Sequence, residues 1–156
     1  MSDLRMKALE GFKVGDTITI SRYFSEELTN QFADITRDYN PVHFDERFSN
    51  ALKLNKRICH GLLVASMLTE IGGQLGCLAS KMNFCFKYPV YFGDTITCCL
   101  KITDIKDGRS AKLEATFSNQ DGNVVIEAET MGILPNEPAK EVIRSMIDEG
   151  DPTNKI

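Results

Sequence analysis

The sequence predicts an α+β domain in which a curved antiparallel sheet wraps around one long buried helix. Residues 61–71 are apolar on nearly every side, which is typical of a helix that lies inside a protein. Four later segments alternate polar and apolar residues with a period of two, as strands with one buried face do. Asp-Gly pairs at 107–108 and 121–122 have the composition favoured in tight hairpin turns.

The elements before the buried helix are short. Residues 16–20 alternate polar and β-branched side chains and predict a strand. Ser25 is a good N-cap, and apolar residues at helical spacing after it predict an amphipathic helix over 25–36. Pro41 disfavours helix at the residue before it, so segment 38–43 is expected to be irregular. A second short helix is predicted over 45–52.

The buried helix is expected to start at Gly61 and to end at the glycines at 72, 73 and 76. Strands are predicted over 81–91, 94–105, 110–119 and 124–134, joined as a meander. Ala111, Leu113, Ala115 and Phe117 should share one face. Pro89 requires its strand to lie at an edge or a bulge.

The domain is predicted to cover residues 1–134, with residues 135–156 as a C-terminal extension. Four apolar residues in this extension have the spacing of one helix face, so we expect it to be partly helical: Val142, Ile143, Met146 and Ile147.

Composition excludes several classes of protein. A net charge of -4 without a basic block argues against a nucleic-acid binder. The first residues hold no apolar run that could act as a signal peptide, and the apolar stretch 61–68 is too short to span a bilayer. Five cysteines without C-x-x-C spacing are expected to be reduced and mostly buried, with Cys98 and Cys99 on opposite faces of a strand. We therefore expect a cytoplasmic protein that binds no membrane.

Asp38 and His43 are the candidate catalytic residues. Pro41 has a fixed φ and restricts Asn40, so the turn between them is stiff and can hold the two side chains convergent. A carboxylate and an imidazole that converge can hold a water molecule for general acid–base chemistry. The same residues are also typical of an ordinary turn with a surface or core histidine. Spacing alone leaves both interpretations open.

His60 and Gly61 also have two interpretations. At the N-terminus of a buried helix, Gly61 can present its N–H to a developing negative charge without a side chain in the way. Alternatively, Gly61 only permits tight packing of the helix start. His60 can orient or cap the same turn.

Segment 38–43 (Asp-Tyr-Asn-Pro-Val-His), with Ala51 eight residues after His43, resembles the hydratase signature of the MaoC-like family. This family includes the (R)-specific enoyl-CoA hydratases of hot-dog fold. The resemblance continues through 58–66 (Ile-Cys-His-Gly-Leu-Leu-Val-Ala-Ser) and 86–94 (Phe-Lys-Tyr-Pro-Val-Tyr-Phe-Gly-Asp), so it covers residues 10–134.

The resemblance implies a single hot-dog domain that adds water reversibly, in syn geometry, to a trans-2-enoyl thioester. In reverse, the enzyme is a 3-hydroxyacyl-CoA dehydratase. Asp38 and His43 are the implied catalytic pair, and the Gly61 amide is the implied donor to the thioester oxygen. Asn40 is the implied brace of the turn, and the residues assigned to the substrate-binding region are Asn40, His60, Ser66 and Thr69.

The implied reaction needs no metal or redox cofactor. Coenzyme A, or the phosphopantetheine of an acyl carrier protein, arrives with the substrate. The resemblance also implies a homodimer or a dimer of dimers, with two sheets joined edge to edge.

Two other functions remain open at this point. A hot-dog acyl-CoA thioesterase usually places an acidic residue on or beside the central helix, where Glu70 is the only carboxylate. A non-catalytic subunit that binds acyl thioesters would keep the pocket without needing Asp38 and His43.

The chain departs from the family pattern in two places. Many members have a small residue and a glycine before the aspartate, where this chain has Thr36 and Arg37. Arg37 is not expected to adopt a positive φ freely, so the approach to Asp38 is expected to differ. Arg37 is either a solvated side chain or a phosphate contact. The stretch 72–83 is also short compared with members whose longer loop borders the acyl pocket, which leaves acyl length undetermined.

Overall fold

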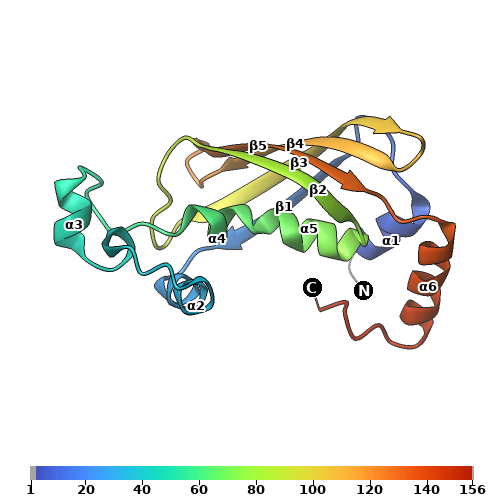
Figure 1. Ribbon diagram of the computed structural model, residues 1–156, viewed down its shortest axis with the longest axis horizontal. Helices are drawn as coiled ribbons and strands as arrows, with labels where there is room; N and C mark the ends of the chain where they lie inside the picture. Colours follow the sequence, from blue (N-terminus) through green and yellow to red (C-terminus); the bar gives the residue numbers. More distant parts are fainter. Residues whose placement is uncertain (1–2, 156) are drawn as a thin grey trace.

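The computed structural model describes residues 3–155. Five antiparallel strands form one sheet in the order β1-β3-β4-β5-β2, curved over the central helices α4 and α5 (Figure 1). The α+β prediction is therefore confirmed. The strands are β1 Thr17–Tyr23, β2 Leu78–Phe86, β3 Thr95–Lys106, β4 Ser110–Ser118 and β5 Val124–Ile133.

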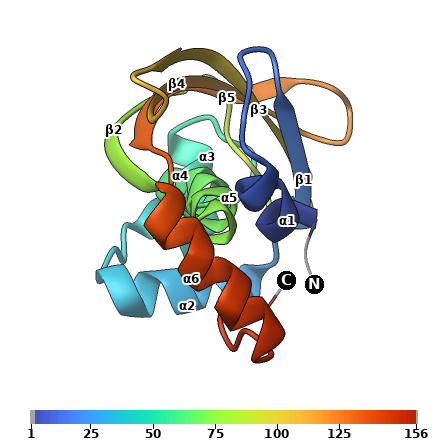
Figure 2. The same ribbon diagram turned by 90° about the vertical axis from the view of Figure 1, so that its right-hand side faces the viewer.

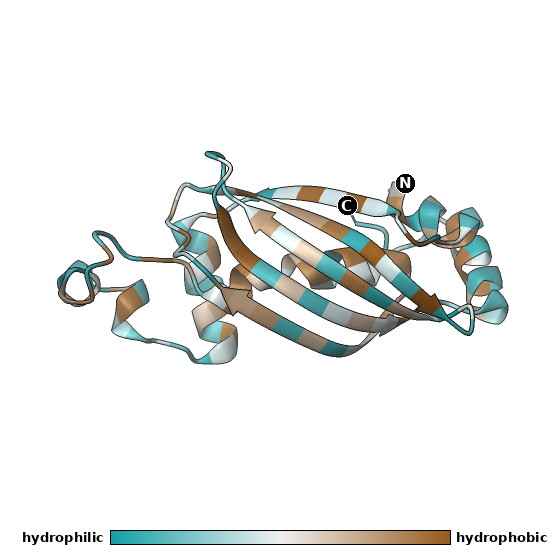
Figure 3. Ribbon diagram, turned by 90° about the horizontal axis from the view of Figure 1, so that it is seen from above, coloured by the Kyte–Doolittle hydropathy of each residue, from teal (hydrophilic) through white to brown (hydrophobic). Residues whose placement is uncertain are grey.

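The sheet buries one face and exposes the other, as the alternation predicted. Figure 3 shows apolar and polar bands alternating along the strands. On β4, Ala111, Ala115 and Phe117 are buried, and Leu113 packs against the same core, so the predicted shared face is confirmed. The turn after β3 has positive φ at both Asp107 and Gly108, which matches a tight hairpin turn.

The predicted meander is correct only for β3, β4 and β5. β2 pairs with β5 and not with β3, and it ends at Phe86, so Pro89 lies outside any strand. The chain leaves the sheet after Phe86 because β2 is the outer strand beside β5, and the next strand, β3, lies near the opposite edge of the sheet, beside β1. In this crossing, the N–H groups of Lys87 and Tyr88 still donate to the Val125 carbonyl.

The central helix is α4, Gly61–Ala65, followed by α5, Met67–Leu75, with Ser66 in right-handed helical conformation between them. The prediction that Gly72 and Gly73 end it is wrong. Both lie within α5, which ends at Gly76, where φ is 66°. Glycine costs a helix only about 1 kcal/mol, and burial of Ile71 and Leu75 on the same helix outweighs that cost.

Three short helices lie between β1 and the central helix: α2 Glu26–Thr36, the 3₁₀ helix η1 Pro41–His43 and α3 Glu46–Ala51. The Ser25 hydroxyl accepts from the Leu28 N–H at 3.2 Å, so the predicted N-cap is confirmed. The expectation for Arg37 is wrong, because φ at Arg37 is 59°. Its N–H donates to the Ala33 carbonyl at 2.6 Å and closes α2, which offsets the steric cost of the left-handed conformation.

Helices at the two ends of the described chain lie together (Figure 2). α6, Glu137–Asp148, confirms the helix predicted in the extension, whereas α1, Asp3–Glu10, was not predicted. Arg5 forms a 3.2 Å ion pair with Asp151, and both side chains are almost fully buried. This ion pair joins the N-terminal helix to the C-terminal extension beside α5.

Cysteines 59, 77, 85, 98 and 99 are all free thiols, as predicted, but only Cys59 and Cys98 are buried. Burial raises the pKa of Cys59 to about 11 and that of Cys98 to about 12, so both stay protonated at neutral pH. Cys98 is buried while Cys99 is exposed, which confirms their opposite faces. Within residues 3–155, no helix has the length and apolar character needed to cross a membrane.

Candidate active site

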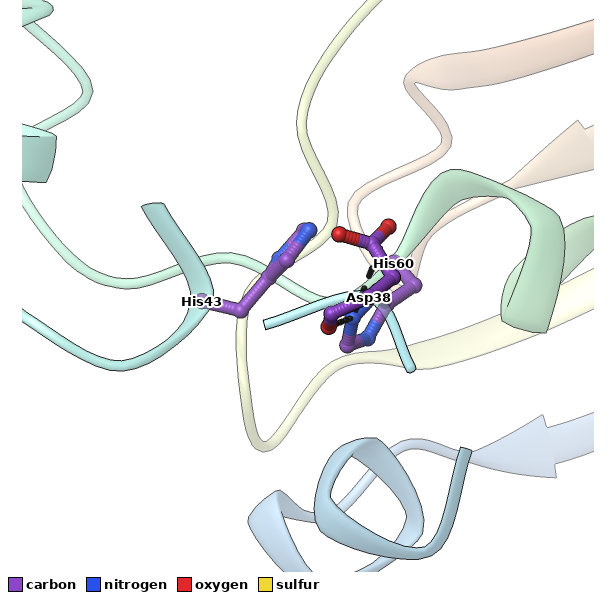
Figure 4. Close-up of side chains that lie close together, drawn as sticks. All are labelled: Asp38, His43 and His60. Atoms are coloured by element: carbon purple, nitrogen blue, oxygen red, sulfur yellow. Dashed lines mark hydrogen bonds and ion pairs between the residues drawn. The ribbon is translucent and has the colours of Figure 1, made fainter. Parts of the chain in front are cut away.

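The structure brings Asp38, His43 and His60 together at one end of the central helix (Figure 4). Asp38 follows α2, His43 ends η1, and His60 immediately precedes α4. One side-chain oxygen or nitrogen from each residue lies within 4.8 Å of those of the other two. The Asp38 carboxylate is half exposed, whereas both imidazoles are buried.

Asn40 and Asp38 shape the turn that carries the pair. The Asn40 side-chain oxygen accepts from the Val42 N–H, and Asp38 Oδ1 accepts from the Asn40 N–H, each at 3.2 Å. The buried Ser49 hydroxyl donates to the Val42 carbonyl at 2.9 Å and holds α3 against the turn. These contacts agree with the bracing expected of Asn40, and Pro41 begins the 3₁₀ helix as its fixed φ favours.

His43 presents one free nitrogen. Its Nδ1–H donates to the Ile58 carbonyl at 2.8 Å, which leaves the lone pair on Nε2 when the ring is neutral. Burial lowers the pKa of His43, and nearby His60 acts in the same direction, against the Ile58 carbonyl and Asp38. A lowered pKa keeps His43 neutral at neutral pH, so Nε2 can accept a proton.

His60 lies behind the pair. Its Nε2–H donates to the main-chain carbonyl of Asp38 at 2.9 Å, and Nε2 is 3.8 Å from the Asp38 carboxylate. A cation ligated by Asp38, His43 and His60 would need a lone pair from each residue. His60 would have to give up its bond to the Asp38 carbonyl or turn its buried Nδ1 outward, so the three do not fit a metal ion as they are arranged.

A cavity of about 620 Å³ opens in front of the pair. Asp38, His43, His60 and Gly61 line it together with mostly apolar residues. The apolar part of the lining includes Phe32, Leu54, Leu62, Phe86, Tyr88 and Ile126. The site therefore combines one carboxylate–imidazole pair with walls suited to an apolar substrate.

Gly61 leaves room where a side chain would not fit. A Cβ at this position would lie 2.7 Å from the Phe86 ring. As the first residue of α4, Gly61 has no partner within the helix for its N–H. The Phe86 ring packs into that space, and Gly61 lines the cavity, from which its backbone can be approached.

Ser66 and Thr69 do not line this cavity. The Ser66 hydroxyl donates to the Leu63 carbonyl at 2.6 Å, and the Thr69 hydroxyl donates to the Ser66 carbonyl at 2.7 Å. Thr69 instead borders a second cavity of about 280 Å³ between α5 and the sheet. Gly72, Met82 and Thr130 line that cavity too. Gly73 lines it as well, so the two glycines within α5 are the sequence signal for this cavity.

Comparisons with known proteins identify the family of this chain. Residues 9–123 match the family described as "MaoC like domain". A mitochondrial 3-hydroxyacyl-[acyl-carrier-protein] dehydratase of Arabidopsis thaliana is 32% identical over 130 residues, 80% of this chain and 78% of the relative. An (R)-specific enoyl-CoA hydratase of Aeromonas caviae is 28% identical over 131 residues, 81% of this chain and 98% of the relative.

Solved structures show the same fold. The (R)-hydratase from Aeromonas caviae superposes with a TM-score of 0.74 at 29% identity, covering 80% of this chain and 98% of that one. An R-hydratase from Pseudomonas aeruginosa has a TM-score of 0.75 at 22% identity, covering 83% and 86% of the two chains. The predicted hot-dog fold is thus confirmed. This chain belongs to the MaoC-like dehydratase family and is a hydratase or dehydratase, a hydro-lyase that acts on acyl thioesters.

Proposed function

We propose that this enzyme reversibly hydrates trans-2-enoyl thioesters to (R)-3-hydroxyacyl thioesters. The observation that carries the proposal is the Asp38–His43 pair at an apolar cavity that also exposes the backbone of Gly61. The (R) configuration follows the named activity of the Aeromonas caviae relative, whose sequence is covered almost completely.

In the proposed reaction, Asp38 and His43 Nε2 hold one water molecule between them. The water oxygen bonds to C3 as the pair accepts a proton, and the C2–C3 π electrons move onto the thioester oxygen. The Gly61 N–H stabilises that enolate oxygen. C2 then takes a proton from the pair on the same face, and the carbonyl re-forms. No electrons are gained or lost, so the proposed reaction needs no redox cofactor, and the pair and the Gly61 N–H take the roles in proton transfer and charge stabilisation that a metal would otherwise have.

The second cavity is the proposed site for the end of the acyl chain. Phe86, Phe84 and Met82 alternate along β2, opposite Ile126, Ala128 and Thr130 of β5. Phe86 and Ile126 line the cavity at Asp38, and Met82 and Thr130 line the second cavity. Phe84 and the small Ala128 therefore lie between the two cavities, along one line beneath the sheet.

The length of this line suggests a range of chain lengths. Leu68 and Gly72 line the second cavity. Along the central helix, the rise from Gly61 to these two residues is roughly 10 and 16 Å. An extended chain of single bonds advances roughly 1.2 Å per bond, as in a polypeptide. The second cavity is therefore within reach of acyl chains of roughly nine to fourteen carbons.

The position of Glu70 disfavours the thioesterase alternative. Glu70 is the carboxylate of α5, but it forms an ion pair with Arg22 of β1. It does not line the cavity that Asp38 and His43 share. A thioesterase would also leave the braced turn of Asp38 and His43 without a role, and so would a non-catalytic binding subunit.

Coenzyme A and carrier-protein thioesters present the same phosphopantetheine arm. The Aeromonas caviae relative is named for CoA substrates and the Arabidopsis thaliana relative for carrier-protein substrates. Lys53 and Lys56 flank Leu54 at the cavity and are exposed, and we propose them as contacts for phosphate groups.

Cytoplasmic location stays a prediction, since the Arabidopsis relative is named as mitochondrial.

A homodimer joined along β2 is also part of the proposal. β2 is an outer strand of the sheet, with an edge available for pairing, and it carries the exposed side chains of Leu78 and Phe86. Light scattering after size exclusion tests this: we expect twice or four times the 17.5 kDa chain mass. A monomer at micromolar concentration would contradict it.

The test of the proposed function uses crotonyl-CoA and longer enoyl-CoA substrates with the purified protein. We expect loss of the conjugated-enoyl absorbance without release of free thiol. Release of thiol would support a thioesterase, and no change with any chain length would support a binding subunit. The same acyl groups on a carrier protein distinguish the two thioester carriers by their kcat/KM.

A further inference from the structure

His60 is enclosed by aromatic rings. Only 2% of its surface is exposed. Its ring stacks on His43 with centroids 3.7 Å apart and planes at 29°. Phe32 and Phe44 contact the same ring from other directions, with ring centroids 5.2 and 6.3 Å from that of His60. A ring held in this way cannot turn without displacing His43.

Two hydrogen bonds hold the turn of Asp38 and His43 against the segment that precedes α4. His60 Nε2–H donates to the Asp38 carbonyl, and His43 Nδ1–H donates to the Ile58 carbonyl. One bond therefore fixes each end of the turn. The arrangement is reciprocal, because each imidazole extends from its own segment and donates to a backbone carbonyl of the other segment.

His60 lines the cavity, but its lone pair is on Nδ1, which is buried. Its Nε2 carries the proton that bonds to the Asp38 carbonyl, and its Nδ1 is buried without a hydrogen-bond partner. Nε2 lies 3.8 Å from the Asp38 carboxylate, too far for a direct hydrogen bond, so the carboxylate stays available to water. These contacts differ from those expected of a general base or of a group that binds substrate.

We propose that His60 is a positioning residue that sets the separation of the two groups that hold the water. It fixes Asp38 through the main-chain carbonyl and fixes the His43 ring through stacking. This inference rests on the proposed function, in which Asp38 and His43 share one water molecule. Displacing either group by about 1 Å is expected to cost ~10²-fold in rate, because proton transfer requires close alignment.

Two variants separate the contributions of the hydrogen bond and the ring. His60→Phe keeps a stacked ring but leaves the Asp38 carbonyl without its donor. His60→Gln keeps an N–H of similar reach but loses the ring. We expect kcat to fall by ~10²-fold in His60→Phe, with a much smaller change in KM, and to recover in part in His60→Gln.

The pH profile provides a measurement that a purely structural role would not change. Asp38 and His60 are the titratable groups that act on the pKa of His43, and His60 lowers it. Both variants should therefore move the acid limb of kcat/KM to higher pH. Phe24→Leu is the control, because Phe24 is fully buried and outside the cavity. We expect that control to lower stability and to leave the pH profile unchanged.

A spectroscopic test does not depend on activity. His43 and His60 are the only histidines of the chain, so ¹⁵N-histidine labelling reports on these two rings alone. We expect the hydrogen-bonded proton on Nδ1 of His43 and on Nε2 of His60. In His60→Gln, the remaining His43 signal should broaden or shift as its ring loses support.

These measurements separate failure of this inference from failure of the proposed function. If the wild-type enzyme hydrates enoyl thioesters and both His60 variants keep its kcat and pH profile, His60 is not a positioning residue. A His60 ring whose proton lies on Nδ1 and not on Nε2 would overturn the inference as well. If no enoyl thioester reacts, the proposed function fails, and the labelled spectrum still tests the hydrogen bond to Asp38.

Discussion

The hydrogen bond from His43 Nδ1–H to the Ile58 carbonyl leaves Nε2 as the nitrogen that carries the lone pair. This one contact decides which part of the ring can act on water. It also connects the turn of Asp38 and His43 to the segment that leads into the central helix, so the proposed acid–base group and the Gly61 amide are linked through Ile58.

Removing either catalytic group should abolish most of the activity. We expect Asp38→Asn and His43→Gln each to lower kcat for enoyl-CoA hydration by at least ~10²-fold, because neither replacement can accept the proton from water. Circular dichroism should show a folded protein in both cases. Glu141→Gln, which changes a charge on the exposed side of α6, serves as a control with unchanged kcat. Full activity in both variants would refute the catalytic assignment.

Activity should persist below the pH at which an ordinary histidine is protonated. Burial lowers the pKa of His43 below 6.5, so its base form survives to lower pH. We therefore expect the acid limb of kcat/KM to lie below pH 6.5. An acid limb clearly above that pH in the wild-type enzyme would argue against His43 as the base.

The same shift makes a prediction for stability. In the unfolded chain the histidine is protonated more readily than in the folded protein, so protonation favours unfolding. The contribution of neutral His43 is fully present above pH 6.5 and is lost as the pH falls from there through its folded pKa. Urea unfolding between pH 7.5 and 5.5 should show this loss, and His43→Gln should show a smaller loss over the same range.

A side chain at Gly72 should shorten the range of substrates. A Cβ on Gly72 would meet no atom within 4 Å in the described structure, so Gly72→Leu adds its side chain to the second cavity without a backbone clash. We expect kcat/KM for enoyl chains longer than roughly eight carbons to fall at least tenfold while crotonyl-CoA hydration is retained. Ala139→Leu adds the same side chain to an exposed helical position and should not change the profile. Equal effects on all chain lengths would place the acyl tail elsewhere.

Neutralising Glu70 distinguishes a hydratase from a thioesterase. Glu70 forms an ion pair with Arg22 between α5 and β1, so Glu70→Gln should lower Tm. Hydration of crotonyl-CoA should continue at a similar kcat, since Glu70 lies outside the cavity of the pair. If the variant instead loses a thiol-releasing activity that the wild type shows, the enzyme is a thioesterase.

Replacing Arg37 by glycine should stabilise the protein. Arg37 adopts a φ of 59°, a conformation that costs L-residues about 1–2 kcal/mol and glycine almost nothing. The greater freedom of glycine in the unfolded chain offsets part of this gain, so we expect about 0.5–1 kcal/mol of added stability. Chemical denaturation measures it, and a loss of stability would contradict the argument. A raised KM for CoA substrates would show in addition that the guanidinium contacts a phosphate.

The local chemistry of the chain was sufficient for several conclusions. Pro41 and Asn40 indicated a stiff turn, Ser25 indicated where α2 begins, and the apolar segment after Gly61 indicated the buried helix. Each of these depends on residues close together in sequence, whose sterics and hydrogen bonds act within a turn or two. The resemblance of segment 38–43 to a known signature then supplied the hydration chemistry.

Tertiary contacts decided what neighbouring residues could not. β2 pairs with β5 because the sheet closes over the helix, a long-range choice that alternation along one strand does not express. Gly72 remains helical because burial of its neighbours outweighs its weak propensity, and Arg37 takes a left-handed conformation because a cap bond compensates the strain. His60 is placed behind His43 by packing between segments far apart in sequence. Local residue types thus determined the proposed reacting groups, and only long-range packing decided their separation, their support and the shape of the cavity in front of them.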